Sequence, residues 1–126
     1  MLAVLSGCDL DVERGPDWLL VRVRRLDPAE SACPALAAQI WQLMEQHFTH
    51  RLVLELDQIP MLSSELIGEL MQLYRLIADH DGVMRLCGLS PHNRAVLHQC
   101  RLDERLPPYE DRQEAVRGAA KPRQPR

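Results

Sequence analysis

Two adjacent serines, Ser63 and Ser64, are the residues of this sequence whose type and position most directly suggest chemistry. They stand between the apolar segment LVLELDQIPML and a segment with helical periodicity. A serine at a helix start can accept a hydrogen bond from a free backbone amide, a cap that contributes about 1 kcal/mol. The same position favours an added phosphate, because a helix N-terminus presents unpaired amides and the positive end of its dipole. We therefore expect one serine to cap the helix and regard the pair as a candidate phosphate-acceptor site.

Other reactive side chains give weaker signals. Glu55 and Asp57 end an apolar segment, a place where ligands of open sheets often bind, although carboxylates there are more often solvated loop residues. Four residues of the metal-binding types Cys and His lie close in sequence without the spacing of known zinc sites: Cys87, His92, His98 and Cys100. The sequence shows no glycine-rich phosphate loop, nucleophile elbow or His-Glu-x-x-His motif. We expect a protein that is not an enzyme and that needs neither metal nor cofactor.

The four cysteines, Cys8, Cys33, Cys87 and Cys100, form no C-x-x-C pair, and the chain shows no convincing export signal. We interpret them as reduced, buried thiols of a cytoplasmic protein. The segment LSGC that ends at Cys8 resembles a lipoprotein processing site, but the apolar segment before it is too short for a signal peptide. No apolar segment is long enough to cross a bilayer, so we expect no membrane association.

The composition is that of a soluble globular chain, with 126 residues, 46% hydrophobic and 26% charged. This length suits one domain, which we assign to residues 1–117. The net charge is -3 and basic residues gather only near the end, which disfavours nucleic-acid binding. Residues 118–126 form a basic, proline-containing tail with nothing to bury, and we expect it to be disordered.

Hydrophobic periodicity predicts an α/β fold, a mixed, largely parallel sheet of about five strands with about four helices. Period-two alternation predicts half-buried strands, and uninterrupted apolar residues predict strands that are buried on both faces. The predicted strands are Leu10–Arg14, Asp17–Arg25, Leu52–Leu56, Val83–Leu89 and, as a short edge strand, Leu106–Tyr109. Helical spacing predicts the helices Glu30–Phe48, Ser64–Asp79, Ser90–Cys100 and Arg112–Val116. In the first helix the apolar face is expected to contain Leu36, Ile40, Leu43 and His47, with Pro34 in the first turn. Asp81-Gly82 is a glycine stop for the second helix, and Ser90-Pro91 begins the third.

The second helix carries two neighbouring apolar stripes. The first is expected to dock on the sheet: Leu66, Leu70, Leu73 and Ile77. The second, formed by Ile67, Met71 and Tyr74, fits either a wide core contact or an exposed surface for a partner. Gly68 lies near this second stripe, and a glycine inside a helix suggests the close approach of another backbone.

The segment from Leu52 to Val116 resembles the STAS domain, which is named for sulfate transporters and anti-sigma-factor antagonists. The resemblance lies in the order of its parts: LVLELDQIPML, SSELIG, and then DGVMRLCGLSPHNRAVLHQCRLDERLPPYEDRQEAV. These parts resemble the central strand, the serine-bearing helix start and the glycine, strand, Ser-Pro, helix and E-A helix pattern of that family.

In regulatory members of the family the helix starts with D-S-S/T-G-L-G, and a partner kinase phosphorylates the serine after the aspartate. The resemblance places Ser64 on the phosphorylated serine, with Ser63 as second choice, and the chain departs from the motif at Ser63, Glu65 and Leu66. The resemblance implies a bacterial anti-sigma-factor antagonist. Its partner would be an anti-sigma factor that is also a serine kinase of the histidine-kinase-like ATPase fold, and phosphorylation would control this binding in a partner-switching scheme. The residues expected to bind this partner are Ser63, Glu65, Ile67, Gly68, Met71 and Tyr74.

The alternative function is a STAS module without phosphorylation that serves as an interaction scaffold or ligand sensor. For the antagonist we expect a monomer or weak dimer. If Ser64 both caps the helix and accepts phosphate, Ser64→Ala is expected to lower the free energy of unfolding by about 1 kcal/mol.

Overall fold

The computed structural model describes residues 2–5, 8–26 and 36–117. The expected tail 118–126, Cys33, Pro34 and the beginning of the first expected helix lie outside the described residues.

In the described part of the chain the strands form one six-stranded sheet in chain order. β1, β2 and β3 pair antiparallel, and β3, β4, β5 and β6 pair parallel. The mixed, largely parallel sheet is thus confirmed, with β6 at an edge and β1 as a strand that the sequence analysis did not predict. The strands are β1 (Leu2–Leu5), β2 (Cys8–Arg14), β3 (Leu19–Leu26), β4 (Arg51–Glu55), β5 (Val83–Cys87) and β6 (Pro108–Tyr109).

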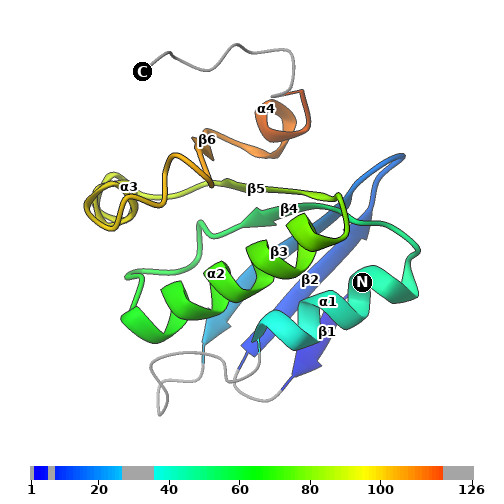
Figure 1. Ribbon diagram of the computed structural model, residues 1–126. Helices are drawn as coiled ribbons and strands as arrows, with labels where there is room; N and C mark the ends of the chain where they lie inside the picture. Colours follow the sequence, from blue (N-terminus) through cyan, green and yellow to red (C-terminus); the bar gives the residue numbers. More distant parts are fainter. Residues whose placement is uncertain (1, 6–7, 27–35, 118–126) are drawn as a thin grey trace.

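Helices cover both faces of this sheet. In Figure 1, α1 and α2 lie next to each other over one face. Side chains of α3 join the same core as α1 and α2, whereas Ala115 of α4 packs in a second cluster. The helices are α1 (Leu36–Gln46), α2 (Ser64–Asp79), α3 (Pro91–Gln99) and α4 (Arg112–Arg117). None of them is both long and apolar enough to cross a bilayer.

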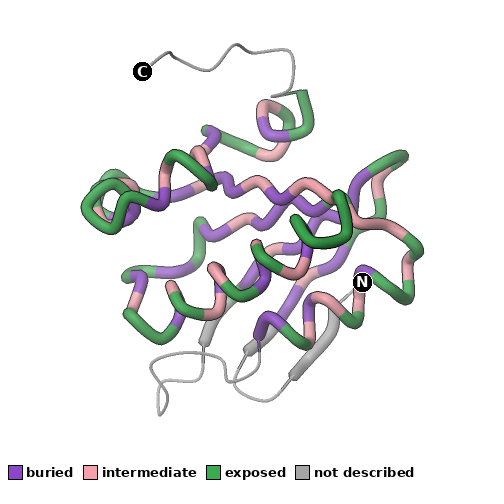
Figure 2. Tube along the Cα trace, in the orientation of Figure 1, coloured by how far each residue is buried: buried purple, intermediate pink, exposed green. Residues whose placement is uncertain are grey.

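The central strand β4 is buried on both faces, as its uninterrupted apolar sequence predicted. Leu52 and Leu54 belong to the main core under α1, α2 and α3, while Val53 belongs to the second cluster under α4. Figure 2 shows this strand as a purple, buried segment in the middle of the molecule. Its partners in the second cluster are Trp18, Leu20, Cys87, Tyr109 and Ala115.

The buried face of α1 and the end of α2 differ in detail from their sequence prediction. Helix α1 buries Leu36 and Ile40 as expected, but Met44 completes the stripe and Leu43 is only partly buried, because the i, i+4, i+8 rows face the sheet. At the end of α2, Asp81 and not Gly82 has the left-handed backbone, with φ 59°. Gly82 is required for space, since a Cβ there would lie 2.2 Å from the His50 carbonyl oxygen.

Cys87 and Cys100 occupy opposite environments. Cys87 is buried in the second cluster, as expected, whereas Cys100 at the end of α3 is exposed, so the expectation of burial is wrong for Cys100. Burial, with a smaller contribution from nearby Glu55, raises the pKa of the Cys87 thiol to about 12. Cys87 is therefore an uncharged thiol at neutral pH.

This difference predicts selective alkylation. At pH 8, iodoacetamide is expected to modify Cys100 and to leave Cys87 unmodified in the folded protein, because only a thiolate that reaches solvent reacts. Peptide mass mapping after labelling, with a urea-unfolded sample as control in which both thiols react, measures the outcome. Native labelling of Cys87 at the rate of Cys100 would contradict the burial of its side chain.

Candidate functional site

The serine pair lies at the N-terminus of α2, and its two members have different roles. Ser63 has an extended backbone, and its Oγ accepts a hydrogen bond from the Leu66 amide at 3.1 Å. Ser64 is the first helical residue; it is exposed, and its Oγ lies 3.4 Å from Glu65 Oε1. The expectation that one serine caps the helix is confirmed, and the idea that Ser64 is the cap is wrong, because a capping residue precedes the first helical turn. The Ser64 hydroxyl is thus accessible and is not needed to start the helix.

The loop between β4 and α2 forms an arch just before these serines. Ile59 and Leu62 are buried, whereas Pro60 and Met61 between them are exposed. The side-chain amide of Asn93, in α3, joins both ends of the arch: Nδ2 donates to the Ile59 carbonyl at 3.0 Å, and Oδ1 accepts from the Leu62 amide at 3.1 Å. The chain that leads into the serine pair is therefore attached to α3.

The sequence analysis did not single out Asn93 or Met61. Asn93 precedes buried Leu97 by four residues, so it is a polar residue on the apolar face of α3, and that mismatch is the signal that could have identified it. Met61 is 62% exposed, which is unusual for a large apolar side chain, but nothing in its neighbours predicts on which side of the loop it lies.

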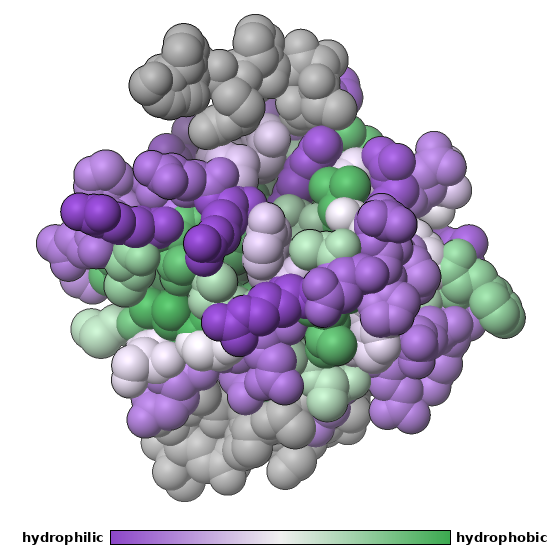
Figure 3. Space-filling model, in the orientation of Figure 1, coloured by the Kyte–Doolittle hydropathy of each residue, from purple (hydrophilic) through white to green (hydrophobic). Residues whose placement is uncertain are grey.

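Helix α2 buries its first apolar stripe completely, as predicted, with Leu66, Leu70, Leu73 and Ile77 in the main core. The second stripe, Ile67, Met71 and Tyr74, is half-buried and packs against the same core, so it is both a core contact and partly open surface. In Figure 3 apolar surface, in green, is visible on the face that carries α2 and α3.

The two flanks of α2 differ in what covers them. Glu69 accepts a hydrogen bond from the Ala37 amide of α1 at 2.8 Å. Ile67 lies about 160° round the helix from Glu69, so the second stripe faces away from α1. Gly68 is exposed, and an added Cβ would meet nothing within 4 Å, so the fold described here places no backbone against it. The close approach suggested by this glycine is not made within the described part of the chain.

The carboxylates after β4 are held in ion pairs. Asp57 receives two hydrogen bonds from Arg22, at 2.9 and 2.6 Å, and these hold the pKa of its carboxyl below the usual range. Glu55 is bound by Arg112 of α4 at 2.8 Å, and Arg112 also reaches Glu13 of β2 at 2.7 Å. Both acids are thus paired with arginines, which favours a role in the fold over acid-base chemistry.

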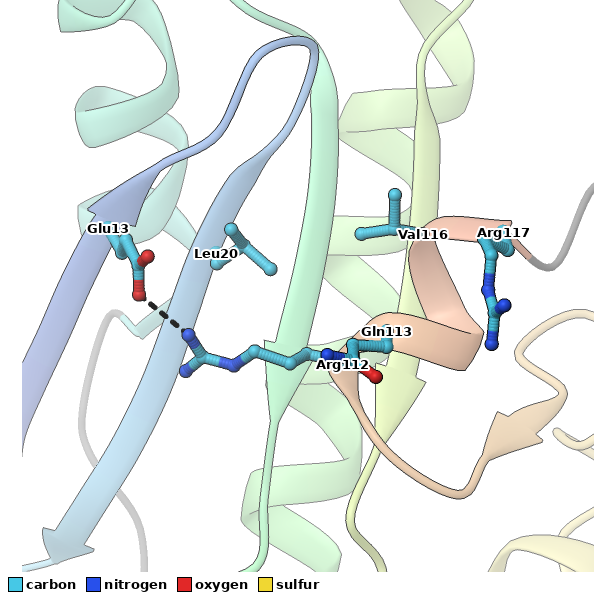
Figure 4. A pocket seen from close by; sticks show the side chains of 6 residues that line it. All are labelled: Glu13, Leu20, Arg112, Gln113, Val116 and Arg117. Atoms are coloured by element: carbon cyan, nitrogen blue, oxygen red, sulfur yellow. Dashed lines mark hydrogen bonds and ion pairs between the residues drawn. The ribbon is translucent and has the colours of Figure 1, made fainter.

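A pocket of about 360 Å³ lies beside this network, between α4 and the sheet (Figure 4). It is on the sheet face opposite α2, because Leu20 in its lining belongs to the second cluster. Its lining residues are Glu13, Leu20, Arg112, Gln113, Val116 and Arg117. The pocket is therefore separate from the serine pair.

The histidines and cysteines do not form a metal site in the described residues, where no group of three or more potential ligands comes together. His98 instead contacts Asp103 at 2.9 Å on the surface, and Cys87 is on the other side of the sheet from α3.

The two serines are expected to differ in their effect on stability. Ser63→Ala should lower the free energy of unfolding by about 1 kcal/mol, because it removes the cap of α2. Ser64→Ala should change it by less than about 0.5 kcal/mol, because the hydroxyl of the exposed Ser64 makes no hydrogen bond to the backbone of the described residues. Urea denaturation followed by circular dichroism measures both values. A larger loss for Ser64→Ala than for Ser63→Ala would contradict the assignment of the cap.

Comparisons with known proteins agree with this architecture. The chain is similar in structure to an anti-sigma factor antagonist from Mycobacterium paratuberculosis, with a TM-score of 0.73, 22% identity and coverage of 93% of this chain and 100% of that chain. A STAS domain protein from Planctomyces limnophilus, described as an anti-sigma-factor antagonist, gives a TM-score of 0.72, 24% identity and coverage of 89% and 98%. The Bacillus cell fate determinant SpoIIAA in its phosphorylated form gives a TM-score of 0.64 and 17% identity, with coverage of 87% of this chain and 98% of that chain.

These likenesses, all below 25% identity, show a shared fold. No curated protein matches the chain in sequence. The family model of the STAS domain matches residues 19–115, which include β3, the serine pair and most of α4. Because that match spans well over half of its 126 residues, this chain belongs to the STAS domain family.

Proposed function

We propose that this protein is a cytoplasmic, non-enzymatic regulator that binds an anti-sigma factor with serine kinase activity and is controlled by phosphorylation of Ser64. The observation that carries the proposal is the exposed Ser64 hydroxyl on the first turn of α2, beside a half-buried apolar stripe. Support comes from the STAS family, from two structural neighbours described as anti-sigma-factor antagonists, and from a third neighbour, a Bacillus cell fate determinant in its phosphorylated form.

The partner surface consists of the start of α2 and its second stripe. It contains the exposed or half-buried residues Ser63, Glu65, Ile67, Gly68, Met71 and Tyr74. The partner we propose is a kinase of the histidine-kinase-like ATPase fold, bound by a monomer or weak dimer of a single STAS domain. Neither nucleic acid nor membrane takes part.

Phosphorylation would act on this surface through charge. A phosphate on Ser64 adds about -1.5 to -2 charges next to Glu65, at the edge of the Ile67 and Met71 side chains. The free amides at the start of α2 offset part of this charge, so the helix itself tolerates it. A partner that covers the apolar stripe would have to remove water from the phosphate, which is unfavourable, and it would be released.

The proposal predicts a single modified residue. Incubation with a candidate kinase and ATP should add one phosphate, located on Ser64 by peptide mass spectrometry and absent in Ser64→Ala. Ser63→Ala should still be modified, and Ser64→Asp should fold with wild-type stability, because an acid is favourable in the first turn, while it binds the partner more weakly. A phosphate on Ser63 would move the site by one residue. If no candidate kinase modifies either serine, the phosphorylation proposal fails, and the scaffold function is favoured.

Gly68 provides a separate test of the partner surface. Gly68→Ala should raise the free energy of unfolding by up to about 1 kcal/mol, because alanine is the better helix former and its Cβ has open space. The same methyl group should weaken partner binding if a partner backbone approaches Gly68 closely. Asp79→Ala is the matched control, a helix-favouring change about 16 Å further along α2 that should leave binding unchanged. If Gly68→Ala stabilises the protein and titration calorimetry shows undiminished partner binding, Gly68 is not part of the interface.

A further inference from the structure

Asn93 is the one buried polar side chain among the described residues, with none of its surface exposed. Burial of an amide is unfavourable unless its polar atoms are hydrogen-bonded, and both side-chain atoms of Asn93 are bonded to the arch. Only one orientation of the amide fits, because the Leu62 N–H needs an acceptor and the Ile59 carbonyl needs a donor. Both bonds reach across from α3 to a loop more than thirty residues earlier in the chain.

The backbone of Asn93 is fixed as firmly as its side chain. Ser90 caps α3, and its Oγ accepts a hydrogen bond from the Asn93 amide at 3.1 Å. The side-chain amide therefore projects from a fixed point on the first turn of α3. From there it holds Ile59 and Leu62 inside the protein and leaves Met61 62% exposed between them.

We propose that Asn93 is a positioning residue for the acceptor site, which it presents by holding the Ile59–Leu62 arch against α3. Leu62 directly precedes the Ser63 cap and Ser64, so the arch fixes where α2 begins and how Ser64 and Met61 face a partner. Without the amide, the Ile59 carbonyl and the Leu62 N–H would be buried without partners, and the arch would move outwards to reach water. The effect on phosphorylation rests on the proposed function, whereas the effect on the arch does not.

The first measurement needs no partner. In Asn93→Leu, which has a similar size but no polar atoms, the Leu62 amide should exchange its hydrogen about tenfold faster or more, while amides of β4 and β5 stay protected. Ala95→Gly is the matched control: it weakens α3 at an exposed position but keeps both the Ser90 cap and the Asn93 amide, so exchange should rise in α3 and not at Leu62. Unchanged exchange at Leu62 in Asn93→Leu would overturn the positioning role.

Asn93→Asp offers a conservative rescue that depends on pH. Near pH 4 the new carboxyl group is largely protonated, so its O–H can donate to the Ile59 carbonyl and its C=O can accept from Leu62. Burial and the neighbouring carbonyl raise its pKa above the unfolded value, so the bonds are present at low pH and are lost as the pH rises towards 7. In α3 it is flanked by exposed His92 and by Arg94, which is paired with Glu110, and the arch residues Ile59 and Leu62 are uncharged. We expect the Leu62 amide of this variant to lose its protection between pH 4 and 7, and we expect no such change in wild type or in Asn93→Leu. If the Asn93→Asp variant shows no such change either, the result counts against the proposal.

The second measurement is phosphorylation at a temperature where circular dichroism shows each variant folded. Asn93→Leu should lower kcat/KM for Ser64 about tenfold or more, and Ala95→Gly should leave it near the wild-type value. Equal rates for Asn93→Leu and wild type, or an equal loss in Ala95→Gly, would overturn the presentation of Ser64 by Asn93. A wild-type chain that no candidate kinase modifies would instead overturn the proposed function, while exchange at Leu62 still decides the role of Asn93 in the arch.

Discussion

Burial of β4 on both of its faces is the constraint on which the rest of this structure depends. Leu52 and Leu54 need cover on one side and Val53 needs cover on the other, so helices must pack against both faces of the sheet. After β4 ends at the edge of the sheet, the chain must pass through a loop before α2 can pack on the sheet face. The start of α2, with Ser63 and Ser64, is placed by that loop.

The two faces created by β4 have different characters. On the α4 side, Arg112 joins Glu55 to Glu13, and the ion pairs connect the last helix to two strands. On the α2 side, the contacts that the described residues make next to the serines include one buried amide, one helix cap and aliphatic packing. The Arg22 and Arg112 ion pairs lie on the other face of the sheet, so they would not compensate a charge added at Ser64, whereas the free amides of its own helix would offset part of it.

The sequence allowed most of the fold to be predicted, because the relevant signals are local. Periodicity placed α2 at Ser64–Asp79, and Ser90-Pro91 placed the start of α3. Details that depend on distant contacts could not be predicted. Gly82 is required because the His50 carbonyl leaves no space for a Cβ, and the burial of Asn93 is explained by its hydrogen bonds to a loop more than thirty residues earlier. The capping serine was ambiguous because both serines suit a helix start, and only the backbone angle of Ser63 distinguishes them.

The division of roles between the serines would allow the proposed phosphate to be added without unfolding the domain. If the acceptor hydroxyl were also the cap, its modification would remove the hydrogen bond that starts α2. In this structure Ser63 makes that bond, and Ser64 lies one residue later with its hydroxyl exposed. The cap of α2 therefore depends on Ser63, whereas under the proposed function the charge of the surface would depend on Ser64. Under the proposed function, a phosphate on Ser64 would therefore change what the surface binds while the Ser63 cap and the fold that presents it stay the same.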